Sequence, residues 1–153
     1  MALNPEIGDI IEIPTSNGFA YAQYTHRHDK FGALLRVLDG FFKSRPKEFD
    51  ALVKRKHRFV IFFPLGAALR RKIFPIVGHA EVPDDAKDFP IFRSGAVGKN
   101  GKVATWWLWD GKKEWRIGHL TPEQRRLPIR GVVNYAALIQ MIDSFWAPET
   151  DSR

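Results

Sequence analysis

The N-terminal third of the chain alternates apolar and polar positions with the two-residue period of β-strands. The strand-like stretch at residues 10–13 leads into the turn-forming residues 14–18, where Gly18 tolerates a positive φ. Between positions 19 and 25, Phe19, Tyr21, Gln23 and Thr25 face one way and the alternate residues face the other. This pattern predicts a β-hairpin, and residues 33–38 are expected to add a third strand.

The middle of the chain combines one short helical pattern with two apolar runs. Residues 46–53 predict a helix with Ser44 as its cap, because the apolar positions fall on one face and a proline suits the first turn. Residues 58–64 and 73–77 have the length and composition of strands. Pro75 cannot donate a ladder hydrogen bond, which places the second of these strands at a sheet edge.

The second half of the chain contains two hairpin signals in succession. Asn100-Gly101 separates residues 96–97 from residues 103–109, and Asp110-Gly111 separates the latter from residues 114–117. Asn-Gly and Asp-Gly favour type I′ turns, which need positive φ at both central residues. We therefore expect a three-stranded meander.

The C-terminal segment predicts a helix that begins after Asn134, a residue suited to capping, and ends before Pro148. Its apolar face is expected to carry Leu138, Ile139, Ile142 and Phe145. The chain as a whole then forms a mainly β (α+β) domain over residues 1–153. We expect an antiparallel sheet or a partly closed small barrel, with a short middle helix and one C-terminal helix.

The composition narrows the location and the chemistry. The chain has no cysteine, so a disulfide, a thiolate metal site and a cysteine nucleophile are all excluded. The N-terminus lacks the basic and apolar segments of a signal peptide, and the most apolar run, residues 59–69, is too short to span a bilayer. We expect a soluble, cytoplasmic protein with no membrane partner.

The positive charge is concentrated in one segment. The chain has a formal charge of +7, and residues 43–72 alone contain ten basic residues against two acidic ones. Such a concentration favours encounters with acidic partners, either protein or nucleic acid. An ordinary solvated surface explains the same composition.

Candidate catalytic or metal-binding residues are few. His26 and His28 flank Arg27 at a spacing that puts both rings on one side of an extended segment, whereas His57, His79 and His119 lie elsewhere. Because zinc needs three or four converging ligands, we expect a solvated loop end here, without metal or cofactor. Phosphate-binding glycine loops and nucleophile elbows are missing from the sequence. A hydrolase would require His26, His28 and a carboxylate to converge in a cleft.

The tryptophans suggest a second candidate surface. Strand alternation puts Trp107 and Trp109 on the face opposite Trp106, so both faces of this hairpin carry large aromatic side chains. Either the sheet is covered on both sides, or one face presents aromatics to a partner.

Several segments together resemble the immunity protein 26 family of bacterial polymorphic-toxin systems. They are residues 8–14 (GDIIEIP), 19–24 (FAYAQY), 37–42 (VLDGFF), 62–66 (FFPLG) and 107–111 (WLWDG). The resemblance implies a mostly β domain that binds and neutralises a toxin domain made by the same or a neighbouring cell. Many immunity proteins against nucleases are acidic, whereas this chain is basic. Its target is therefore expected to be an acidic toxin surface, or an interface dominated by aromatics.

The leading hypothesis is a non-enzymatic binding protein for a cognate toxin. The expected partner-binding residues are Tyr24, His26, Arg27, His28, Trp107, Trp109 and Arg116. One alternative is a nucleic-acid-binding module that uses residues 43–72, and a second is an unrecognised hydrolase.

Overall fold

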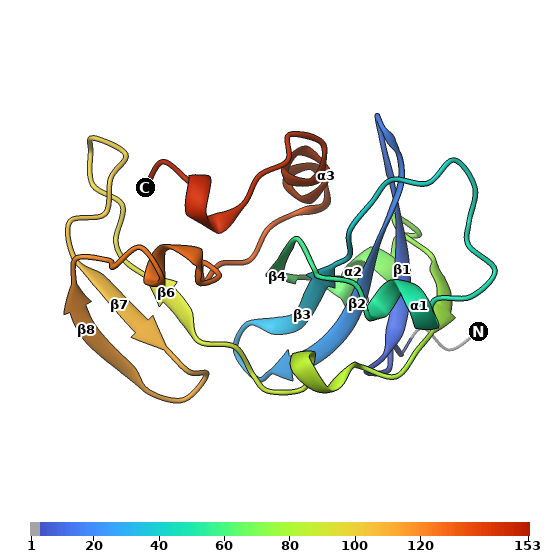
Figure 1. Cartoon of the computed structure of the whole chain (residues 1–153), viewed down its shortest axis with the longest axis horizontal. Coiled ribbons are helices and arrows are strands. Elements are labelled where there is room, and N and C mark those ends of the chain that lie inside the picture. Colours follow the sequence, from blue (N-terminus) through green and yellow to red (C-terminus); the bar gives the residue numbers. More distant parts are fainter. Residues whose placement is uncertain (1–3) are drawn as a thin grey trace.

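The computed structural model describes residues 4–153 and arranges their strands in two antiparallel sheets (Figure 1). The larger sheet has the order β4-β3-β2-β1-β5, and the smaller has the order β6-β7-β8. The strands are β1 (Asp9–Thr15), β2 (Gly18–His28), β3 (Gly32–Val37), β4 (Phe59–Phe63), β5 (Ile76–His79), β6 (Phe92–Ser94), β7 (Trp106–Trp109) and β8 (Glu114–Gly118). The mainly β class is confirmed, and the strands form two open sheets without closing into a barrel.

Short helical segments connect and cover the sheets. They are α1 (Asp50–Val53), α2 (Leu65–Arg70) and α3 (Tyr135–Asp143), with 3₁₀ turns η1 (Asp84–Ala86), η2 (Gln124–Arg126) and η3 (Pro148–Thr150). No helix within residues 4–153 is long and apolar enough to cross a bilayer. The small sheet lies at one end of the molecule and the β1–β2 hairpin at the other (Figure 1).

The larger sheet is covered on both faces, to which successive residues of β2 contribute in turn. Ala22 packs in the cluster that contains Leu138 and Ile142 of α3. Tyr21, its neighbour, points to the opposite face and packs with Leu52 of α1. A register shift between Tyr24 and His26 interrupts this alternation near the end of β2. The expected helix cap is also confirmed, since the Asn134 side chain accepts a hydrogen bond from the backbone of Ala137 at 2.8 Å.

The predicted middle helix is shorter than its sequence pattern. Only one turn forms, and Phe49 takes the N-cap position without a side-chain cap, so Ser44 plays no capping part. The reason lies in the preceding segment, where Arg45 reaches across to the buried Glu12 of β1 with N–O distances of 2.8 and 3.0 Å. That attachment holds residues 44–48 in a bent, non-helical course before α1.

The C-terminal helix ends before Phe145, so this residue does not belong to the buried face predicted for it. Phe145 is 66% exposed and has a φ of 56°. Trp146 donates its backbone N–H to the carbonyl of Met141, which is the Schellman termination of a helix. The reversal turns Trp146 instead of Phe145 towards the core, where its ring meets Phe59 edge to face.

The three-stranded meander forms, but its first strand lies further back than predicted. β6 is Phe92–Ser94, and residues 96–97 contribute only an isolated bridge between Val97 and Val103. In the arm before the Asn100-Gly101 turn, Val97 is the only β-branched or aromatic residue between Gly95 and Gly98, so this arm has little strand propensity. Neither turn is of type I′, because only the glycine of each has a positive φ.

The apolar run at residues 73–77 yields a strand only after its proline. β5 begins at Ile76 and pairs with β1 alone, which makes it an edge strand as expected from Pro75. The six-residue helix α2, which follows β4 directly, was not anticipated from the sequence.

Candidate protein interface

A groove of about 390 Å³ lies on the small sheet beside Trp107. Trp106 and Trp107 both line it, and the β7–β8 register shifts between them, where Ile117 of β8 is the extra, unpaired residue. Trp106 is buried, whereas Trp107 is 36% exposed. Val103 and Ile129 add apolar wall to the groove. The groove therefore offers a partner an aromatic surface that the fold already holds in place.

Charged side chains form the rim of this groove. Arg130 donates from Nη1 to Glu114 of β8 at 2.8 Å. The Arg130 guanidinium also lies over the rings of Trp109 and Phe31, 5.2 and 5.5 Å from their centroids. These contacts fix the orientation of Arg130, so a partner meets a preorganised cation beside Trp107.

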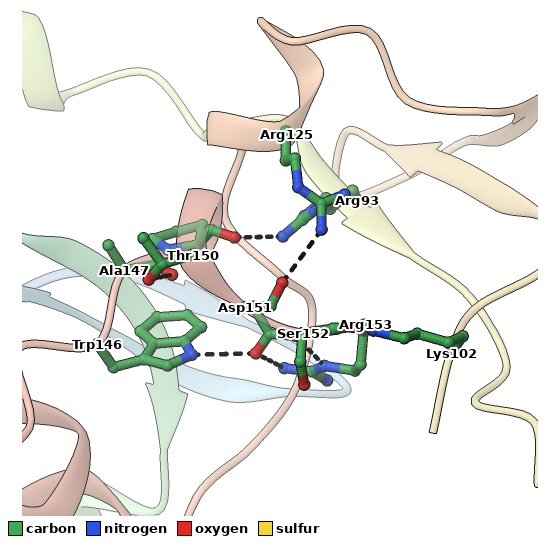
Figure 2. A network of polar contacts seen from close by, with 10 residues as sticks. Arg93, Lys102, Arg125, Trp146, Ala147, Thr150, Asp151, Ser152 and Arg153 are labelled. Atoms are coloured by element: carbon green, nitrogen blue, oxygen red, sulfur yellow. Dashed lines mark hydrogen bonds and ion pairs between the residues drawn. The ribbon is translucent and has the colours of Figure 1, made fainter. Parts of the chain in front are cut away.

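The C-terminal residues supply a second arginine, Arg153, to the groove. Figure 2 shows the network of polar contacts around Asp151 that holds this arginine. Asp151 accepts hydrogen bonds from the indole of Trp146 at 3.0 Å and from the Arg153 guanidinium at 2.8 and 2.9 Å. The Arg153 bonds hold the pKa of the Asp151 carboxyl well below its usual range. The backbone carbonyl of Asp151 accepts from Arg125 of η2 at 3.2 Å. Asp151 thus ties the C-terminal residues to η2 and holds Arg153, which lines the groove.

Arg93 of β6 lies behind this network and is fully buried. It donates to the carbonyl of Pro148, and its guanidinium stacks 4.7 Å from the ring centroid of Trp106. Its Nε and Nη1 groups have no hydrogen-bond partner within the described part of the chain. Burial, together with the nearby Arg125, lowers the pKa of Arg93 to about 10. Arg93 therefore supports the ring of Trp106, which lines the groove, from the buried side.

The structure brings together three of the residues predicted to bind a partner, the half-buried His26 and His28 and the buried Trp109, where the two sheets meet. The ring centroids of His28 and Trp109 are 4.9 Å apart, and His26 meets the same cluster through Phe89 at 5.5 Å. Trp109 is buried in this cluster with Phe62 of β4. The cluster joins the end of the larger sheet to the small one, so these residues hold the two sheets together.

Hydrogen bonds occupy the ring nitrogens of both histidines. His28 Nδ1 accepts from the backbone N–H groups of Lys30 and Phe31 at 3.1 and 3.2 Å, so its Nε2 carries the hydrogen donated to the Gly111 carbonyl. His26 bonds through Nε2 to the Lys87 carbonyl at 2.7 Å and through Nδ1 to a threonine hydroxyl. The convergence with a carboxylate that a hydrolase would need does not occur at these rings within residues 4–153.

The other predicted partner-binding residues are divided between core and surface. Tyr24 is buried in the main core cluster, which corrects its assignment to an interface. Tyr24 shares one face of β2 with Ala20 and Ala22, and this pattern of alternate apolar residues is the sequence signal for its burial. Arg27 is exposed at the end of β2, away from the groove. Trp107 and Arg116 lie opposite each other across β7 and β8, and both are exposed, so they remain interface candidates.

The basic residues 43–72 do not form a uniform cationic surface. Arg45 is paired with Glu12, and the Arg58 guanidinium donates to the Ile142 carbonyl at 2.9 Å. The backbone of this segment is anchored by the buried Arg36, which donates to the carbonyls of Val53 and Arg55, each at 2.8 Å. The remaining lysines and arginines of the segment are exposed.

A second concentration of positive charge belongs to the small sheet. Residues 92–130, which contain its three strands and η2, include nine basic residues and three acidic ones. The tryptophans therefore lie within a basic unit of their own, although the segment 43–72 is remote in sequence. The basic residues of this unit are spread along the sequence, so they form no dense run comparable to residues 43–72.

One group of metal-ligating side chains escaped the sequence analysis. Oxygen or nitrogen atoms of Glu6, Asp9 and His79 all lie within 4.8 Å of one another. His79 Nδ1 is 2.9 Å from the Asp9 carboxylate, which also accepts the backbone N–H of Glu6 at 2.8 Å. These bonds connect the N-terminal turn to β5. His79 lies 70 positions from Asp9, so the sequence carries no local signal for the group. Within residues 4–153, these three side chains could hold a cation.

Comparison with known proteins does not assign a family. No protein-family model, curated protein or solved structure matches this chain. A function must therefore be inferred from the geometry of the small sheet and from the resemblance carried by the sequence segments.

Proposed function

We propose that this chain is a binding protein that acts without catalysis and docks its partner on the small sheet. The observation that carries the proposal is the exposed Trp107, which adjoins a preformed groove and faces Arg116 across the two strands. Tryptophan and arginine are the residues that most often dominate binding energy at protein interfaces. The arginines already held at the rim reduce the entropy lost on binding.

The proposed partner is a cognate bacterial toxin domain, which the chain neutralises in the cytoplasm. The resemblance to immunity protein 26 supports the class of partner, and the charge of the small sheet supports its chemistry. Nine basic residues against three acidic ones in residues 92–130 suit an acidic toxin surface. They do not suit the basic active site of a nuclease.

The test is to co-express the chain with the toxin-like product of an adjacent gene and to measure their affinity calorimetrically. Trp107→Ala should weaken binding by about thirtyfold, the effect of losing a hot-spot side chain worth about 2 kcal/mol. Ile76→Ala is a matched control, because Ile76 is similarly exposed, at 37%, but lies in β5 of the other sheet. Growth of the toxin-expressing host reports neutralisation independently.

Two results would contradict the proposal. If no neighbouring gene product binds, the partner assignment fails. Equal loss of affinity in Trp107→Ala and Ile76→Ala would show that the small sheet is not the interface.

Nucleic-acid binding is the second candidate, and one observation favours it. Trp107 and Trp115, which are 36% and 39% exposed, lie within the basic unit 92–130. Single-stranded nucleic acid binds where its bases can stack on exposed aromatic side chains and nearby cationic side chains neutralise its phosphates. Residues 43–72 would extend the cationic surface.

This candidate is tested with a fluorescently labelled single-stranded DNA oligonucleotide at several salt concentrations. Because binding releases counterions, a plot of the logarithm of the binding constant against the logarithm of the salt concentration is a straight line. Its slope is about −0.7 for each phosphate contacted. Trp115→Ala should weaken binding about tenfold through the lost stacking. An affinity that is the same at low and physiological salt rules the candidate out.

A further inference from the structure

The open edge of the small sheet is the feature that points to how a partner docks. β4 and β6 are edge strands covered by the chain itself, since residues 128–133 pass alongside them. The backbone N–H of Val133 donates to the Phe62 carbonyl at 3.1 Å, and the backbone N–H of Arg93 donates to the Pro128 carbonyl at 2.8 Å. β5 is also an uncovered edge strand, but it has only four residues. β8, with five residues, is the longer edge strand whose outer side no other backbone covers among residues 4–153.

We propose that an extended acidic segment of the partner pairs with β8 as a fourth strand of the small sheet. This inference rests on the proposed function and specifies its mode of binding. Exposed edge strands present unpaired N–H and C=O groups, which are the template for strand addition. Main-chain pairing would supply affinity, and the side chains that flank it would supply selectivity.

The hairpin geometry identifies which backbone groups of β8 face outward. The Asp110 N–H donates to the Lys113 carbonyl at 3.1 Å, so these two residues form a hydrogen-bonded pair. Hydrogen-bonded and non-hydrogen-bonded pairs alternate along antiparallel strands. The pairs Trp109–Glu114 and Trp107–Arg116 are therefore of the second kind. It follows that the N–H and C=O groups of Glu114 and Arg116 point away from β7, towards an added strand.

The side chains of β8 define the chemistry of the complementary strand. Trp115 projects from one face, and Arg116 projects from the other together with Glu114, which Arg130 already pairs. An added strand would lay apolar residues beside Trp115 and acidic residues beside Arg116. A second copy of this chain is disfavoured there, because two units rich in basic residues would meet.

The probe for this mode is an acetylated and amidated heptapeptide that alternates Glu and Val, titrated into the full chain by calorimetry. The wild-type chain should bind it, and Arg116→Ala should bind about threefold to tenfold more weakly because one charge is lost. Arg116→Pro removes the same charge and also the outward N–H, and should bind at least about tenfold more weakly than Arg116→Ala. Circular dichroism of both variants checks that the sheet persists.

A change in the peptide tests the same point without altering the protein. N-methylation of alternate amides, on the edge that meets β8, should abolish binding while leaving every side chain in place. Failure of the unmodified peptide to bind at millimolar concentration overturns the inference, as does equal binding of the methylated peptide. If a toxin partner binds and Trp107→Ala weakens it, but Arg116→Pro equals Arg116→Ala, strand addition fails and the proposed function stands.

Discussion

At the scale of single residues, Glu12 shows how one buried carboxylate determines the course of a loop. Its side chain is 8% exposed and accepts hydrogen bonds from the Tyr21 hydroxyl at 2.9 Å and from two nitrogens of Arg45. The Arg45 bond, against the opposing effect of burial, lowers the pKa of Glu12 below its ordinary value of 4.5. The same bond is what prevents residues 44–48 from joining α1.

The depressed pKa of Glu12 predicts a loss of stability in acid. A carboxyl whose pKa is lower in the folded state stabilises the fold above its unfolded pKa, near 4.5, and the contribution disappears as the pH falls through the folded value. Urea unfolding between pH 7 and pH 3 should show Glu12→Gln less stable than the wild type at pH 7. The difference should shrink towards pH 3. Parallel pH curves for the two proteins would contradict this account.

Arg93 predicts a large effect from a residue that no partner can touch. Arg93→Ala leaves a cavity beneath Trp106 and removes the donor to the Pro148 carbonyl, so the free energy of unfolding should fall by about 3 kcal/mol. Arg125→Ala, which removes a half-buried arginine of the same network, should cost about 1 kcal/mol or less. Denaturant unfolding measures both. Equal costs would mean that burial of Arg93 is not what matters.

At the scale of elements, α3 illustrates a helix whose two ends are set by different means. Asn134 caps its start with a side-chain hydrogen bond, whereas the end depends on a left-handed Phe145. Near that end, the Asp143 carboxylate accepts the Ser16 backbone N–H at 3.1 Å and the Asn17 side-chain amide at 3.0 Å. The helix therefore holds the tip of the β1–β2 hairpin as well as covering the sheet.

The cap gives a clean prediction for α3. Asn134→Ala should lower the free energy of unfolding by about 1 kcal/mol, because the Ala137 N–H loses its acceptor. Asn134→Asp keeps an acceptor at the same place and should remain within about 0.5 kcal/mol of the wild type. Thermal and denaturant unfolding distinguish the two variants. A similar loss in both would show that the side-chain bond contributes little.

Elements whose signals are local could be predicted from the sequence, and those set by distant contacts could not. The β1–β2 hairpin depends on alternation and on Gly18, all within neighbouring residues. The non-helical course of residues 44–48 depends on Arg45 meeting Glu12, 33 positions earlier. The same holds for the candidate site. Trp107 and Trp109 share a sequence pattern, but only Trp109 is covered by phenylalanines from β4 and the loop before β6.

At the scale of the whole molecule, the two sheets share one aromatic cluster. His28 from β2, Phe62 from β4 and Trp109 from β7 have ring centroids between 4.9 and 6.2 Å apart. Arg130 caps this cluster and also forms the rim of the groove. Binding at the small sheet is therefore mechanically connected to the interior of the molecule.

The shared cluster predicts that the chain unfolds as one cooperative unit over residues 1–153. Four of its five tryptophans lie between positions 106 and 115, so fluorescence reports mainly the small sheet, whereas far-ultraviolet circular dichroism reports both sheets. The two transitions should coincide in denaturant. Trp109→Ala should lower the free energy of unfolding seen by both signals by about 3–5 kcal/mol, whereas Trp115→Ala, at an exposed position, should lower it by less than about 1 kcal/mol.

A fluorescence transition at lower denaturant than the dichroism transition, or one shifted alone by Trp109→Ala, would mean that the small sheet unfolds independently. In that case the aromatic cluster would be a contact between two separate units, and strain from binding at β8 would not reach the larger sheet.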